Sequence, residues 1–296
     1  MPRSCRPRSA VAHAASCAFP AVSDPESIMA AVQEAKRVPE LAEPADPSSS
    51  AVRRVRIAAM ADMHIGRSSS PGVAQAFARV RDVADVLVLC GDLTDRGTED
   101  EAQQLGRDLK AIGLPIVAVL GNHDFEAGHP EQVARILSDS GVHMLDGEAI
   151  EVHGVGFAGV KGFGGGFGRG ALGPWGEPTI KAFVQEAVDE ALKLETALAR
   201  LRTPRKVAVL HYAPVRGTVE DEPLEIFPYL GSSRLEEPLN RYPVDVVFHG
   251  HAHGGRFEGR TSGGVPVYNV AAPLLQRRNA SAPPFHVVEF TWNDGG

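Results

Sequence analysis

Five apolar segments of the sequence are each followed at once by polar side chains that can bind metal ions. The segments span 55–60, 86–90, 116–120, 207–210 and 244–248, and continuous apolar runs of this length are typical of strands covered on both faces. In layered α/β proteins such strands lie parallel, and the loops after them meet at one edge of the sheet. We therefore expect the polar side chains after these segments to lie close together.

Helical and strand-like segments alternate along the chain from Arg53 onward. Helices are expected over 73–83, 99–112, 131–138 and 179–201. Further strand-like runs span 149–160, 265–270 and 285–290. This alternation predicts an α/β fold class. Because no clear linker separates the halves, it favours one domain of two or four layers in which two sheets pack together.

The first 52 residues differ from the rest in composition. They are rich in Ala, Pro and Ser and contain no acidic residue before Asp24. Such a composition does not build a core, so we predict a disordered extension over 1–52 and a folded domain over 53–296. The stretch from Ala10 to Phe19 is too short and too weakly apolar for a secretory signal.

Composition and charge narrow the classes of protein. With 43% hydrophobic and 23% charged residues, and no apolar run near the roughly 18 residues of a membrane span, the chain resembles a globular protein without membrane segments. The net charge of −7 argues against a broad nucleic-acid surface, although it leaves room for a local basic groove. Three cysteines without a Cys-x-x-Cys motif favour a reducing compartment, and we expect a cytoplasmic location. The oligomeric state stays open.

The residues after the five strands form short motifs. They are Asp62-Met63-His64, Gly91-Asp92, Gly121-Asn122-His123-Asp124, His211, and His249-Gly250-His251-Ala252-His253. Each residue alone is most simply a cap, a turn residue or a solvated side chain. At one sheet edge, however, so many carboxylates and imidazoles would be unfavourable without a cation. The ligand types, without thiolates, suit Mn²⁺, Fe or Zn²⁺.

In their order and strand contexts, these motifs resemble the signature of the calcineurin-like metallophosphoesterases. That signature runs Asp-x-His, Gly-Asp, Gly-Asn-His-Asp/Glu, His and Gly-His-x-His, and the resemblance spans about 55–270. It is nearest to the phosphodiesterase branch, including the class III cyclic-nucleotide phosphodiesterases. The resemblance implies a layered α-β-β-α sandwich with a dimetal site at the carboxyl ends of the strands, and hydrolysis of phosphate esters, above all diesters.

The same resemblance implies roles for individual residues and two bound ions of Mn, Fe or Zn. Asp62, His64 and His253 would bind one ion, Asn122, His211 and His251 the other, and Asp92 would bridge the two. A metal-bound hydroxide would attack phosphorus in line, and His123 would assist the leaving group. For Asp124 two interpretations stay open: it orients the imidazole of His123, or it serves as a helix cap or turn residue.

Substrate contacts are less specified by the sequence. Arg96, in Gly-Asp-Leu-Thr-Asp-Arg-Gly, resembles a phosphate-binding Arg of the serine/threonine phosphoprotein phosphatases, and a surface turn residue is the alternative. The glycine-rich segment 161–178 carries Phe163, Phe167 and Arg169, which would suit either a mobile lid over the substrate's organic group or a plain surface loop.

We expect the substrate to be a small-molecule phosphate ester. Phosphomonoesterase, phosphoprotein phosphatase and nuclease activities are the alternatives on the same fold. A non-catalytic scaffold is the least supported alternative, because every expected ligand position is filled. The histidines outside the motifs, and His249, are expected to be structural or exposed.

Overall fold

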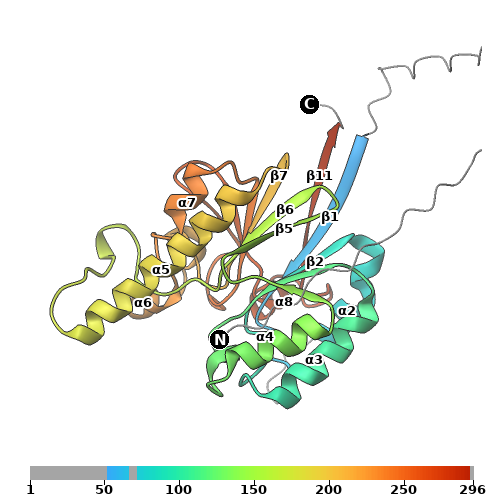
Figure 1. Ribbon diagram of the computed structural model, residues 1–296, viewed down its shortest axis with the longest axis horizontal. Coiled ribbons are helices and arrows are strands. Elements are labelled where there is room, and N and C mark those ends of the chain that lie inside the picture. The colour runs from blue at the N-terminus through green and yellow to red at the C-terminus, as the bar shows by residue number, and fades with distance from the viewer. Residues whose placement is uncertain (1–51, 67–71, 294–296) are drawn as a thin grey trace, which may run out of the picture. The chain divides into compact units, whose positions relative to one another are not determined.

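The computed structural model describes residues 52–66 and 72–293. These residues belong to one compact unit that runs from Ser50 onward. Two β-sheets pack face to face in it, and helices cover their outer faces (Figure 1). The predicted disordered extension over 1–52 lies, apart from Val52, outside the described residues, so that boundary stays a prediction.

The first sheet has the strand order β11-β1-β2-β3-β4. Its strands are β1 (Val52–Met60), β2 (Val86–Cys90), β3 (Ile116–Val119), β4 (Val142–Met144) and β11 (His286–Asn293). The first four are parallel, and β11 pairs antiparallel with β1. The helices that follow these strands are α2 (Val73–Val83), α3 (Glu99–Ile112) and α4 (Pro130–Asp139), with the 3-10 turn η1 (His123–Phe125) before α4.

The second sheet has the order β5-β6-β7-β8-β10-β9. Its strands are β5 (Glu148–Val152), β6 (Val155–Gly159), β7 (Arg205–Val209), β8 (Val246–His249), β9 (Glu258–Arg260) and β10 (Pro266–Asn269). The inner four are parallel, and the two edge strands are antiparallel to their neighbours. Its helices are α5 (Pro178–Arg200), α6 (Phe227–Leu230), α7 (Glu236–Arg241) and α8 (Ala272–Arg278), with 3-10 turns η2 (Gly168–Gly170), η3 (Arg216–Thr218) and η4 (Leu224–Ile226).

Continuous apolar strands arise because both faces of each sheet are covered. In β2, Val86 and Val88 face the second sheet in the central core, whereas Leu87 and Leu89 pack in the cluster under α2, α3 and α4. A third cluster packs the second sheet against α5 and α7. The predicted α-β-β-α sandwich is therefore confirmed, and of the two alternatives the four-layer arrangement holds.

The elements that the sequence did not predict are short. The strands β4 and β9 have three residues each, and α6, α7 and α8 have four to seven. Segments of this length contain too little of a hydrophobic period to be recognised. Among the described residues, no helix combines the length and apolar character needed to cross a membrane.

Phe157 fills the centre of the core between the two sheets and is fully buried. We expect Phe157→Ala to lower the free energy of unfolding by about 3–5 kcal/mol, since it removes a buried ring and leaves a cavity. Urea unfolding followed by circular dichroism measures this change. Leu192→Ala on α5, whose side chain is 54% exposed, is the control, with an expected change below about 0.5 kcal/mol. Equal losses in both variants would contradict the packing described.

Candidate metal centre

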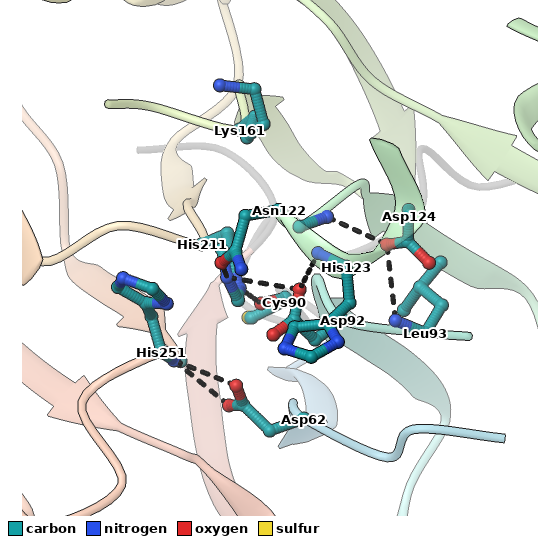
Figure 2. A network of polar contacts seen from close by, with 12 residues as sticks. Asp62, Cys90, Asp92, Leu93, Asn122, His123, Asp124, Lys161, His211 and His251 are labelled. Atoms are coloured by element: carbon teal, nitrogen blue, oxygen red, sulfur yellow. Dashed lines mark hydrogen bonds and ion pairs between the residues drawn. The ribbon is translucent and has the colours of Figure 1, made fainter. Parts of the chain in front are cut away.

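The predicted metal ligands lie in loops at the carboxyl ends of β1, β2, β3, β7 and β8, where these loops meet (Figure 2). Asp62, His64 and His253 present ligand atoms within 4.8 Å of one another, and so do Asp92, His211 and His251. Asn122 adjoins the second group, with its Oδ1 2.9 Å from Nε2 of His211.

Asp92 lies between these two groups. Its Oδ2 is 3.8 Å from Nε2 of His64, and its Oδ1 is 3.3 Å from Nε2 of His211. The structure therefore brings all seven predicted ligands together in the grouping that the resemblance implied. The assignment of each residue to a particular ion stays a proposal.

The backbone at this edge adopts an unusual conformation. Among the described residues, six other than glycine have positive φ, and four of them are predicted ligands: Asp62, His64, Asp92 and His251. A left-handed conformation is disfavoured for residues with a Cβ, and residues held in it cluster at functional sites. The turns after β1, β2 and β8 thus bend sharply enough to aim four side chains into one space.

Two motif glycines permit the close approach of these turns. A Cβ on Gly250 would collide with the carboxylate of Asp62 and the side chain of Ala61. A Cβ on Gly121 would collide with the backbone nitrogen and the carboxylate of Asp92. Glycine is therefore required at both positions for the strand ends to meet.

The imidazole of His211 shows why a cation fits this site. Its Nδ1 lies 2.9 Å from the carbonyl oxygen of Cys90 and donates to it, so Nε2 is left with the lone pair. That Nε2 faces oxygen atoms of Asn122 and Asp92. Burial lowers the pKa of His211, which disfavours an imidazolium that could donate to them. A cation among these three acceptor atoms would relieve their repulsion.

The protonation states of His64 and His251 also suit metal ligands. Burial lowers the pKa of His64 to about 4 and that of His251 to about 3, so both rings are neutral near pH 7. His251 donates from Nε2 to the carbonyl of Tyr229 at 3.0 Å, which leaves Nδ1 as its ligand atom. Burial and the nearby charge of Asp62 raise the pKa of Asp92 to about 7, a penalty that a bound cation would remove.

His123 lies beside the two ligand groups. Its ring centroid is 4.4 Å from that of His64, and its Nδ1 lies 2.9 Å from the carbonyl oxygen of Asp95. Burial opposes the charged form, but the Asp95 carbonyl and the charges of Asp92 and Glu126 outweigh it, and the pKa of His123 is raised. With Nδ1 donating to this carbonyl, Nε2 is the nitrogen that can exchange a proton with a ligand.

Of the two interpretations that the sequence left open for Asp124, its hydrogen bonds favour the structural one. Its buried carboxylate accepts hydrogen bonds from the backbone N–H groups of Leu93, Thr94 and Gly121 and from the Thr94 hydroxyl. These donors come from the loops that carry Asp92 and Asn122 (Figure 2). Asp124 therefore ties two ligand loops together, and the carbonyl of Asp95 orients the His123 imidazole in its place.

The four predicted substrate contacts do not form one surface. Arg96 and Arg169 are exposed, and the backbone N–H of Arg96 donates to Glu101 at the start of α3. Phe167 is buried in a small apolar cluster with Phe227, so it is a packing residue and not a substrate contact. Phe163 is half-buried and contacts the rings of Phe183 and Tyr212.

The glycine-rich segment is also built into the fold over its first half. The backbone N–H groups of Gly165 and Gly166 donate to the carbonyls of Pro228 and Gly231, and the backbone N–H of Ser233 donates back to Gly166. This backbone pairing favours the plain-loop alternative for residues 165–167, and the cluster that buries Phe167 also contains Ala213 and Ala252.

Three further residues matter at this edge. His249 is buried, contacts the carbonyl of Gly250 and the hydroxyl of Thr218, and is structural as expected. The carboxylate of Asp95 lies within 4.8 Å of ring nitrogens of His64 and His123, a proximity that sequence reasoning missed. Lys161 directly follows the run that contains β6, so the rule of a polar residue after an apolar strand could have identified it.

A two-sheet sandwich with carboxylates and imidazoles gathered at its strand ends is the arrangement that the sequence predicts for a metal-dependent phosphoesterase. A model of the calcineurin-like phosphoesterase family matches residues 55–255, and the chain belongs to this family. The chain is also 24% identical over 221 residues to a "Probable cyclic nucleotide phosphodiesterase" of Synechococcus sp., an alignment that covers 69% of this chain and 75% of that protein.

Solved structures share this fold. The phosphopantetheinyl hydrolase PptH of Mycobacterium tuberculosis is 18% identical, with a TM-score of 0.58 over 78% of this chain and 95% of that one. TT1561 of Thermus thermophilus is 15% identical, with a TM-score of 0.50 over 81% of this chain and 99% of that one. At these identities the likeness establishes the fold alone.

The role of Asp124 can be tested by Asp124→Asn. The new amide has one acceptor oxygen and places an NH₂ group against backbone donors, so we expect the free energy of unfolding to fall by about 1–3 kcal/mol. The affinity for Mn²⁺ should fall as well, because the Asp92 and Asn122 loops lose their common anchor. Urea unfolding and isothermal titration calorimetry measure the two effects. Asp139→Asn, at the exposed end of α4, is the control, and equal behaviour of both variants would contradict the assignment.

Proposed function

We propose that this protein is a phosphodiesterase that hydrolyses esters of small molecules with the help of two metal ions. The observation that carries this proposal is the position of Asp92 between two ligand groups, with His123 close beside them. Ions in this position would lower the pKa of a water molecule and neutralise charge on the attacking and leaving oxygens.

The chain's own residues would contribute orientation and a proton. Asp62, Asp92 and Asn122 would supply oxygen ligands, and the rings of His64, His211, His251 and His253 would supply nitrogen ligands. The backbone of His123 donates to Asp92 at 2.9 Å, which holds its ring at a fixed place relative to the ligand groups. Nε2 of His123 would protonate the leaving alkoxide oxygen, which departs as the alcohol, since the raised pKa of His123 favours the charged donor.

A diester is favoured over the alternatives by two observations. The Synechococcus relative carries a phosphodiesterase name, and the sequence ends its motif series with Gly-His-x-His at 250–253. The sequence Asp95-Arg96-Gly97 is the only basis for a phosphoprotein phosphatase. The net charge of −7 supports a small substrate over a nucleic acid.

Metal dependence and substrate class can be tested in one assay. We expect chelator-treated protein to be inactive and added Mn²⁺ to restore cleavage of bis-p-nitrophenyl phosphate, with a higher kcat/KM for it than for p-nitrophenyl phosphate. The release of p-nitrophenolate is followed by its absorbance. Preference for the monoester would overturn the diester assignment, and activity in the chelator would overturn the metal assignment.

Separate variants distinguish binding from chemistry. We expect His123→Ala to lower kcat by about 10²–10⁴-fold while retaining bound metal, because the ring acts on the leaving group and is not a proposed ligand. Asp92→Asn should lose both metal and activity, because its carboxylate serves both groups. Metal analysis of the purified variants accompanies the kinetics. His143→Ala, at an exposed position on β4, is the control, and metal loss in His123→Ala would contradict the division of roles.

A further inference from the structure

A cavity of 320 Å³ shares η1 and the loop after β6 with the candidate metal centre, and its lining contains none of the predicted ligands. It is bounded by η1, α4, α5 and the segment that joins β4 to β5. Leu120, Phe125 and Met144 contribute apolar surface, and Glu131, Lys161 and Glu186 contribute charged groups. Concave sites that combine apolar walls with a few charged groups are where small ligands bind.

Two wall residues connect the cavity to the metal centre. Phe125 belongs to the same 3-10 turn as His123. The carbonyl of Lys161 accepts hydrogen bonds from the backbone N–H groups of His211 and Tyr212, each at 3.0 Å. In the view of Figure 2, Asn122 lies between Asp62 and Lys161. The amino group of Lys161 points away from the carboxylates of Asp62 and Asp92. An ester group of a phosphate bound at the metal centre would therefore point into reach of this cavity.

The inner wall of the cavity carries a fixed cation. The amino group of Lys161 lies 5.0–5.3 Å from the ring centroids of Phe125, Phe163 and Tyr212, and it donates to the carbonyl of Gly162 at 2.8 Å. Cation–π attraction of this kind holds an ammonium in place. A positive charge is thus located on the side of the cavity toward His211.

The outer wall carries carboxylates. Lys193 pairs with Asp146 at 3.0 Å and with Glu190 at 2.8 Å, so these two acids are balanced. The side chains of Glu131 and Glu186 are exposed, and neither carboxylate is in a hydrogen bond or ion pair of the described residues. Burial lowers the pKa of Lys161, however, and the negative charge of Glu186 partly offsets this effect. The cavity is therefore polarised, with a cation toward the metal centre and two available carboxylates toward solvent.

We propose that this cavity binds one organic group of the phosphodiester substrate and that this group carries an ammonium; the inference rests on the proposed function. Such an ester is zwitterionic: its phosphate lies at the metal centre and its ammonium lies a few carbon atoms away. Leu120 and Met144 would contact the carbon chain, and Glu131 and Glu186 would hold the ammonium. Lys161 would repel an ammonium placed at the inner wall, which sets the direction of the bound group.

The test compares two diesters that differ only in the charge of one group. They are 3-aminopropyl p-nitrophenyl phosphate and butyl p-nitrophenyl phosphate, which have chains of equal length. We expect the wild-type protein with Mn²⁺ to favour the aminopropyl ester in kcat/KM by about tenfold. The double variant Glu131→Gln/Glu186→Gln should lose most of this preference, because its kcat/KM should fall far more for the aminopropyl ester than for the butyl ester. Asp189→Asn, an exposed position on α5 outside the cavity wall, is the control and should keep the preference.

The possible outcomes distinguish failure of the cavity proposal from failure of the phosphodiesterase proposal. Equal kcat/KM for both esters, or a preference that survives in the double variant, would overturn the cavity assignment and leave the phosphodiesterase proposal standing. Preference for a 3-carboxypropyl ester would overturn it too, in favour of an anion at Lys161. Cleavage of neither ester would overturn the phosphodiesterase proposal. Calorimetric binding of 3-aminopropylphosphonate against butylphosphonate then decides the cavity, with tighter binding of the amine in wild type alone as the supporting result.

Discussion

The electrostatic problem at the strand ends governs the rest of this structure. Asp62 and Asp92 are buried carboxylates, and His211 turns an unprotonated nitrogen toward oxygen atoms. Burying such groups together is strongly unfavourable unless a cation neutralises them. The raised pKa of Asp92, with its value of about 7, expresses that penalty in the absence of added charge. The fold therefore holds a site whose stability and function depend on what binds there.

Bringing these buried side chains together requires unusual turns in the loops that carry them. The turns that carry Asp62, Asp92 and His251 use left-handed backbone, which is unfavourable for these residues by about 1–3 kcal/mol each. Such turns persist only if their surroundings fix them. The carboxylate of Asp124 does so for the β2 and β3 loops, and close packing at Gly250 does so for the β1 and β8 loops. The contacts that fix these loops are thus as necessary to the site as the predicted ligands themselves.

The sequence predicted the features that repeat and missed those that depend on one contact. Long apolar strands and amphipathic helices have periods that a sequence displays, and the strands at 86–90 and the helices at 73–83 and 99–112 were predicted to the residue. The sequence indicated that the candidate ligands lie together because strand ends share an edge, and the resemblance to the family implied which of them bind metal. The partner of His123 could not be predicted, because the carbonyl of Asp95 reaches it through the shape of a turn and not through a residue type.

Features that depend on a single contact also explain why the role of Phe167 was predicted wrongly and why Lys161 was not recognised. Aromatic residues in a glycine-rich loop suggest exposure, yet pairing with residues 228–233 carries Phe167 into a buried cluster. Lys161 was passed over because it is a cation among expected metal ligands, although it follows an apolar strand as they do. Its backbone holds His211 while its amino group lies among three rings. One strand end therefore joins the candidate metal centre to the wall of the proposed substrate cavity, and substrate choice is expected to reside on that wall.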